Sequence, residues 1–258
     1  MKFRLVENLN TETLLEAQNT AELTEEEKQF FKAHRALLAS NDVDNLLREY
    51  WKIENNENRL HHFYSVLIKM AGVDFLLKHM TVIPAGFFKG NTTIRDVVIP
   101  ENIKYVFKEA FANSTIHKIN CEDSQITEIS NSCFANSSFL TDVSLPDGLY
   151  WIGNSAFSGC PISDILLPYS IQFIGMFAFY GSNIHKITMP KSVHTIMRDC
   201  FRNSCLEEVT WEKSNHDVYI EDLAFKSANE HVMKFNCFHN TSAEKYAKEH
   251  GYKIEYLD

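Results

Sequence analysis

LPDGLYWIGNSAFSGC at residues 145–160 and LPYSIQFIGMFAFYG at residues 167–181 are two copies of one motif, and this motif decides the fold. Both copies place a phenylalanine directly after an alanine, and this phenylalanine returns along the chain. It is found at Phe88, Phe111, Phe134, Phe157, Phe179, Phe201 and Phe225, with spacings of 23, 23, 23, 22, 22 and 24 residues. A single unit of this length cannot bury its own apolar side, whereas stacked units can. The sequence therefore predicts an array of about seven coils.

The residues on either side of the phenylalanine predict a tight corner. The preceding residue is small in six of the seven copies, and at Cys133 and Cys200 a cysteine replaces alanine. The residues two positions later are mostly types that tolerate a left-handed backbone: Gly90, Asn113, Asn136, Gly159, Gly181, Asn203 and Ser227. Each phenylalanine is thus expected to anchor a turn, with the two cysteines buried beside it.

An L-x-x-L-x-L segment follows each corner, and Leu140, Val143 and Leu145 form one example. Its second half alternates as a strand with one buried face does. Proline follows in four coils and ends the strand, because it has no amide hydrogen to donate. A second apolar pair, such as Leu149 and Ile152, predicts another short strand before the next corner. An insertion at residues 213–217 breaks the register of the last coil.

The full pattern, I-P-x-x-[VI]-x-x-I-G-x-x-A-F-x-G-C, resembles BspA-like leucine-rich repeats over residues 81–230. Residues 242–254 also resemble the closing segment of that family. The resemblance implies an α/β repeat solenoid of short strands and corner turns, preceded by an α-helical N-terminal cap. It also implies a binding scaffold, often one found on bacterial surfaces or in adhesion.

The two ends of the chain do not repeat. Residues 1–80 read as helices: Thr24 and the three glutamates after it form a capping box, Asn41 or Asp42 caps a second helix, and two more follow at residues 58–70 and 73–80. We expect this block to be an N-terminal cap or a docking module. Residues 231–258 predict a C-terminal helix and strand cap, with Thr241 or Ser242 as the helix cap and Gly251 as its stop.

Composition excludes some classes of partner. The net charge is −9 at pH 7 and no run of lysine and arginine is present, so nucleic acid is not an expected partner. The first residues lack the apolar stretch of a secretory signal, and no window approaches the ~18 apolar residues of a membrane span. The expectation is a cytoplasmic protein without a membrane partner.

The residues that usually carry chemistry do not assemble into a known site. No G-x-S-x-G elbow, G-x-G-x-x-G or Walker motif occurs, and the helical block contains no cysteine, which excludes a thiol enzyme there. His61 and His62 are adjacent rather than one helical turn apart, and Cys237 with His239 is a solitary pair. We expect no metal, no cofactor and no enzyme, although an enzyme carried by the helical block is an alternative.

The outward positions of the strands suggest where a partner binds. Six residues before each corner phenylalanine, four of six coils carry an aromatic residue. With one neighbouring tyrosine these aromatics are Tyr105, Tyr150, Trp151, Phe173 and Tyr219. Neighbouring coils lie about 4.8 Å apart, so Trp151 and Phe173 should touch. The strand of the L-x-x-L-x-L segment has an outward face of mixed charge, which is acidic around Asp142 and Asp164.

These surfaces predict a non-enzymatic protein that binds another protein, with a glycan as an alternative ligand. The oligomeric state does not follow from the sequence. The opening residues 3–7 resemble the starts of small phage or mobile-element proteins of Gram-positive bacteria. That resemblance implies a second alternative, a protein that binds and inhibits a host defence protein.

Overall fold

The computed structural model describes residues 24–258, apart from residues 35, 38–39, 55 and 228–231. The chain divides into two compact units, Met1–Ile83 and Pro84–Asp258. The first 23 residues of the expected helical block, including the opening segment at residues 3–7, lie outside the described residues.

The first unit is helical where the sequence predicts helices. It contains α2 (Glu25–Ala33), α4 (Val43–Ile53), α5 (Glu57–Ala71) and α6 (Val73–His79), followed by β1 (Val82–Ile83). Asp42 is the cap of α4, since its side chain accepts a hydrogen bond from the Asn45 amide. Aromatic rings fill the core of the unit, where Phe63 stacks on Tyr50 with 3.7 Å between ring centroids. The role of this unit as a cap stays a prediction.

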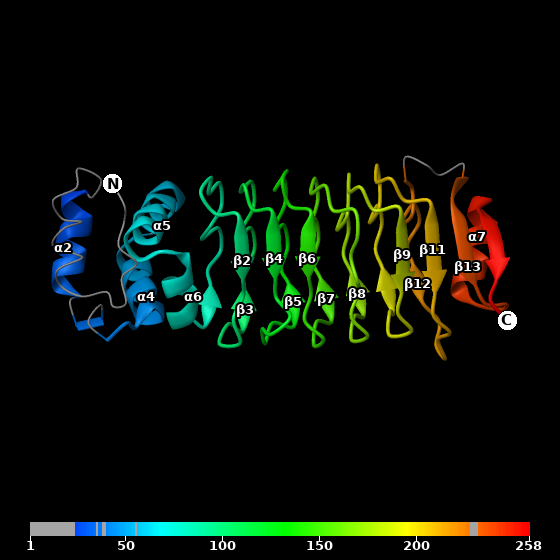
Figure 1. Cartoon of the computed structure of the whole chain (residues 1–258), viewed down its shortest axis with the longest axis horizontal. Coiled ribbons are helices and arrows are strands. Elements are labelled where there is room, and N and C mark those ends of the chain that lie inside the picture. Colours follow the sequence, from blue (N-terminus) through cyan, green and yellow to red (C-terminus); the bar gives the residue numbers. More distant parts are fainter. Residues whose placement is uncertain (1–23, 35, 38–39, 55, 228–231) are drawn as a thin grey trace. The chain divides into compact units, whose positions relative to one another are not determined.

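The second unit is a solenoid of about eight turns built from short parallel strands (Figure 1). The first strands of the coils form two sheets: one contains β2 (Asp96–Val98), β4 (Lys118–Asn120) and β6 (Asp142–Ser144), and the other contains β9 (Lys186–Met189), β11 (Glu208–Trp211), β13 (Lys234–Cys237) and β14 (Lys253–Tyr256). The second strands form a third sheet, with β5 (Glu128–Ile129), β7 (Trp151–Ile152), β8 (Phe173–Ile174), β10 (Thr195–Ile196) and β12 (Tyr219–Ile220). β3 (Tyr105–Val106) occupies the same position in an earlier coil.

The seven repeated phenylalanines form one continuous stack through the core. All of them are buried, and successive ring centroids lie 4.9, 5.1, 5.2, 5.6, 5.3 and 5.4 Å apart with nearly parallel planes. Ala156, Cys133 and Cys200 are fully buried beside the stack. The prediction of a shared register and of two cysteines in alanine positions is confirmed.

The corners contain more left-handed backbone than the sequence indicates. Six of the seven expected positions have a positive φ, between 55° at Asn113 and 72° at Gly159, but Ser227 does not, so the expectation there is wrong. A second left-handed position lies two residues before each phenylalanine. In all coils but the first it holds a residue other than glycine: Glu109, Ser132, Ser155, Phe177, Asp199 and Leu223. Composition gave no signal for this strained position, because these side chains share no tolerance for it.

One predicted strand is missing. Residues 161–168, expected to pair between β6 and β9, are not assigned to a strand, and the first-strand sheet is therefore split in two. The amides of Thr115 and Cys205, at the equivalent place in their coils, donate to the preceding coil at 2.9 and 3.1 Å. The chain has Pro161 at this place, which has no amide hydrogen, and the coil-to-coil bond is lost.

A column of buried hydroxyl groups runs beside the phenylalanine stack. Its members are Ser114, Ser137, Ser182, Ser204 and Ser227, with Cys160 in the place of a serine. Most bind a carbonyl oxygen: Ser137 Oγ donates to Phe111 O at 2.8 Å, and Cys160 Sγ donates to Phe134 O at 3.0 Å. Phe111 O and Phe134 O also accept the amides of Ser114 and Ser137, so the side-chain bonds add a second donor to each of these corner carbonyl groups. Cys160 is therefore a buried core residue.

The array ends with α7 (Ser242–His250) and β14. Thr241 is the cap, since its hydroxyl oxygen accepts from the Glu244 amide at 3.2 Å, and Gly251 ends the helix in a left-handed conformation. β14 pairs in parallel with β13. The predicted closing helix and strand are confirmed.

Candidate functional site

The predicted aromatic positions lie on the outward face of the second-strand sheet. Trp151 pairs with Phe173, and Thr195 pairs with both Phe173 and Tyr219, so these positions lie in one column across the sheet. We use the name aromatic column for its aromatic residues together with Tyr105 on β3 and Tyr150, which precedes Trp151: Tyr105, Tyr150, Trp151, Phe173 and Tyr219. Trp151 and Phe173 are 38% and 41% exposed. Among the described residues their rings form no stacked or edge-on pair, so the expected ring contact is not found.

The aromatic column is not required by the packing of the coils. In five of the six coils the residue that follows the outward position, such as Ile152 or Ile174, is buried and provides the core contact, whereas Ile220 after Tyr219 is partly exposed. Glu128 and Thr195 occupy the outward position of the same sheet and pair in register with their aromatic neighbours. A coil therefore closes without a ring at this position, and the exposed rings are available for other contacts.

Charged side chains of alternating sign follow the outward face of the first strands. Lys118 Nζ lies 2.8 Å from Asp142 Oδ2, and this hydrogen bond raises the pKa of Lys118. Further along the array, Lys186 Nζ lies 2.9 Å from Glu208 Oε2, and hydrogen bonds from Lys186 and Asn236 lower the pKa of Glu208. These exposed pairs contribute little stability each, but they neutralise most of the face.

Asp164 differs from Asp142 and Lys186, its neighbours on the outward face of the first strands, in its backbone and, within the described part of the chain, in its lack of an ion pair. It lies on the segment that lacks a strand, and it makes no ion pair among the described residues. Asp142 and Asp164 line one recess of about 720 Å³, so the structure brings these two predicted residues together. The recess borders the first-strand sheets, whereas the aromatic column lies on the second-strand sheet.

Two exposed apolar residues on the same coil were not predicted as site residues. Leu166, 83% exposed, lines the recess beside Asp164, and Tyr169, 74% exposed, lies at the corner between Asp164 and Phe173. Leu166 could have been found, because the equivalent positions hold Asn120, Ser144, Thr188 and Thr210 in four other coils. Leu166, Tyr169 and Phe173 thus place apolar groups on both sides of one corner.

No group of three or more histidine, cysteine, aspartate or glutamate side chains is placed to hold a metal ion in the part of the chain that the structure describes. Burial raises the pKa of the Cys121 and Cys160 thiols to about 12 and that of Cys237 to about 11, which disfavours the nucleophilic thiolate. Among the described helices, none has the length and apolar character needed to cross a membrane.

Comparison with known structures returns bacterial leucine-rich-repeat proteins. A Treponema pallidum leucine-rich repeat protein is 21% identical, with 62% of this chain and 85% of that one covered and a TM-score of 0.40. The pneumococcal vaccine antigen PcpA is 15% identical, with 64% and 56% covered and a TM-score of 0.38. A leucine-rich repeat protein from Bacteroides ovatus is 15% identical, with 70% of each chain covered and a TM-score of 0.35.

The search of curated proteins returns no match. The model of the BspA type leucine rich repeat region matches residues 61–141 and 127–247 in six copies, which is well over half of the chain. Its repeats coincide with the coils that carry the phenylalanine stack. The chain therefore belongs to the family of BspA type leucine-rich-repeat proteins.

Proposed function

We propose that this chain is a non-enzymatic scaffold that binds a protein partner through the outer surface of its central coils. The surface consists of the aromatic column, with Trp151 and Phe173 at its centre, and of the corner that leads to Asp164 and Asp142. One observation carries the proposal: large aromatic side chains are half exposed at a position that Glu128 and Thr195 show to be free of packing demands.

The chemistry of this surface favours a particular kind of protein partner. Tryptophan and tyrosine are the residue types that most often dominate binding energy, and contiguous exposed apolar groups mark interaction sites. Asp164, which has no ion-pair partner among the described residues, adds a carboxylate beside the exposed Leu166. A segment with apolar anchors next to a lysine or arginine would complement both features.

The test compares two tryptophans of equal exposure in the two units. Trp51, on α4, is 40% exposed and Trp151 is 38% exposed, so Trp51→Ala is a matched control for Trp151→Ala. A partner is first isolated by affinity purification with the wild-type chain, and its affinity for each variant is then measured by calorimetry together with thermal melts. We expect Trp151→Ala to weaken binding by about 2 kcal/mol or more with little change in stability, and Trp51→Ala to leave binding intact.

Three other outcomes of this experiment would place the binding site elsewhere or change the class of ligand. If Trp51→Ala weakens binding and Trp151→Ala does not, the helical unit is the docking module and the proposal is wrong. Loss of binding with Asp164→Asn alone would move the site to the recess. The alternative of a glycan ligand predicts that purified glycans, rather than a protein, compete for the wild-type surface.

A further inference from the structure

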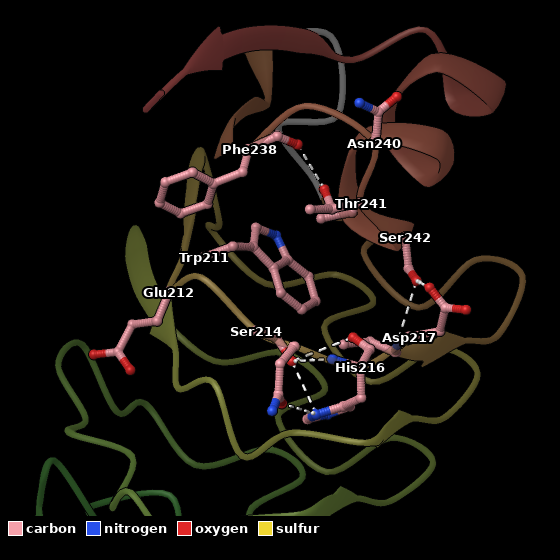
Figure 2. Close-up of a pocket in the computed structure, with 12 residues that line it drawn as sticks. Trp211, Glu212, Ser214, His216, Asp217, Phe238, Asn240, Thr241 and Ser242 are labelled. Carbon is pink, nitrogen blue, oxygen red and sulfur yellow. Dashed lines mark hydrogen bonds between the residues drawn. The ribbon is translucent and has the colours of Figure 1, made fainter.

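The insertion that breaks the register of the last regular coil opens a pocket next to Tyr219, at one end of the aromatic column and away from its centre at Trp151 and Phe173. Residues 214–218 form one wall, and the segment that leads from β13 into α7 forms the other (Figure 2). The pocket has a volume of about 350 Å³, which is at the low end of the range of small-molecule sites. Its size suits one small ligand rather than a protein segment.

Trp211 carries a polar group that no described residue binds. The residue is only 5% exposed, and its indole Nε1 is buried with no hydrogen-bond acceptor among the described residues. In Figure 2 the indole lies between the two walls, with its nitrogen on the side of Thr241. Buried polar groups in folded proteins are nearly always paired, and since no described residue supplies an acceptor, this N–H is open to an acceptor from a ligand.

The other lining groups supply both donors and acceptors in fixed positions. Asp217 Oδ1 is 3.4 Å from the Ser242 hydroxyl, which also accepts from the Val218 amide at 3.0 Å. The His216 ring is held between Ser214 Oγ and the Val193 carbonyl oxygen, each at 2.9 Å. A second aromatic ring, that of Phe238, is partly exposed at the edge of the pocket.

The charges of the pocket argue against an ionic ligand. Glu212 and Asp217 contribute carboxylates, and Lys213 brings an ammonium group to the edge of the pocket, with its Nζ 5.3 Å from the centroid of the Phe238 ring. Because two carboxylates face this single ammonium group, the pocket disfavours an anion. These carboxylates and His216 do not converge into a group that could hold a metal ion. A neutral molecule with several hydroxyl groups satisfies donors and acceptors without a net charge.

We infer that this pocket binds a neutral polyhydroxyl ligand of the size of a single sugar unit, with one ligand oxygen accepting the Trp211 indole hydrogen. Hydroxyl groups of the ligand donate to Asp217, which lines the pocket. This inference does not rest on the proposed protein-binding surface. The pocket adjoins only Tyr219, at one end of the aromatic column, so variants at Trp151 and at Trp211 test the two sites separately.

The experiment follows the indole N–H resonances of the ¹⁵N-labelled full chain during titration with a sugar. Glucose, galactose and N-acetylglucosamine are the probes. Sodium sulfate and sodium acetate are titrated in parallel to test whether the pocket binds an anion instead. The resonance of Trp211 is assigned by its loss in Trp211→Phe, and those of Trp51 and Trp151 serve as internal controls. At least one sugar should shift the Trp211 resonance in a saturable manner, without shifting the other two.

Two variants separate binding from folding. Trp211→Phe removes the donor and should weaken sugar affinity about tenfold, as expected for one hydrogen bond. Because Trp211 also packs edge-on against Phe225, Asp217→Ala provides a second variant at an exposed acceptor and should weaken affinity by a similar factor. Absence of a saturable shift with all three sugars, a larger response to sulfate or acetate, or unchanged affinity in both variants would overturn the inference.

Discussion

The stack of phenylalanines allows the sharpest prediction, which concerns Phe157 in a central coil. Its ring lies 5.2 Å from that of Phe134 and 5.6 Å from that of Phe179, with interplanar angles of 1° and 7°, and the side chain is fully buried. Phe157→Ala removes both ring contacts, each worth about 0.5–1.5 kcal/mol beyond burial, and leaves a cavity. The total expected loss of unfolding free energy is about 3 to 5 kcal/mol.

The control for this prediction lies in the same coil. Phe173→Ala deletes the same side chain from the solvent-facing side of β8, so it should cost less than about 1 kcal/mol. Both variants are unfolded in urea and followed by circular dichroism, and the denaturant dependence shows whether unfolding stays cooperative. A loss below about 1 kcal/mol for Phe157→Ala, with unchanged denaturant dependence, would refute the shared stack as the source of stability.

Three further predictions concern the backbone, the thiols and one acid. Ser155 has a φ of 54°, so Ser155→Gly should raise stability by up to about 1 kcal/mol in the same unfolding assay, whereas Ser158→Gly, at a neighbouring position without a positive φ, should lower it. In the native protein a thiol reagent should label Cys205, which is partly exposed, and after denaturation without reductant it should label all six cysteines; rapid native labelling of more than one would contradict the burial. Hydrogen bonds from Lys248, Tyr256 and the Asn240 amide lower the pKa of Glu244 from about 4.5 to about 2. The carboxylate of Glu244 therefore stabilises the folded state above pH 4.5, and this stabilisation is lost as the pH falls through 2. The melting temperature of wild type should exceed that of Glu244→Gln at pH 7, and the two melting temperatures should converge near pH 2.

The sequence predicted what depends on apolar side chains in a fixed register. The spacing from Phe88 to Phe225 established the stack, and the alternation in the strands identified Ile152 and Ile174 as buried and Trp151 and Phe173 as outward. These features could be predicted because burial of apolar area is the main driving force, and it leaves a periodic signal.

The features that were missed depend on single backbone groups. Pro161 interrupts the first-strand sheet through the loss of one amide hydrogen, and Phe177 adopts a left-handed φ of 57° that its residue type does not suggest. The pocket around Trp211 arises from an insertion of irregular sequence, so no repeat position could indicate which residues would line it. The partner-binding role of the aromatic column stays a prediction from sequence and geometry.

The interruption at residues 161–168 gives the solenoid a mechanical asymmetry. The bonds between coils run along the array, so a bending load is shared between the sheets on its different sides. At this coil the second-strand sheet is continuous from β7 through β8 to β10, while the first-strand sheets stop at β6 and start again at β9. We therefore expect the array to bend more readily at this coil, about the continuous backbone of Trp151 and Phe173 and toward a wider recess beside Asp164.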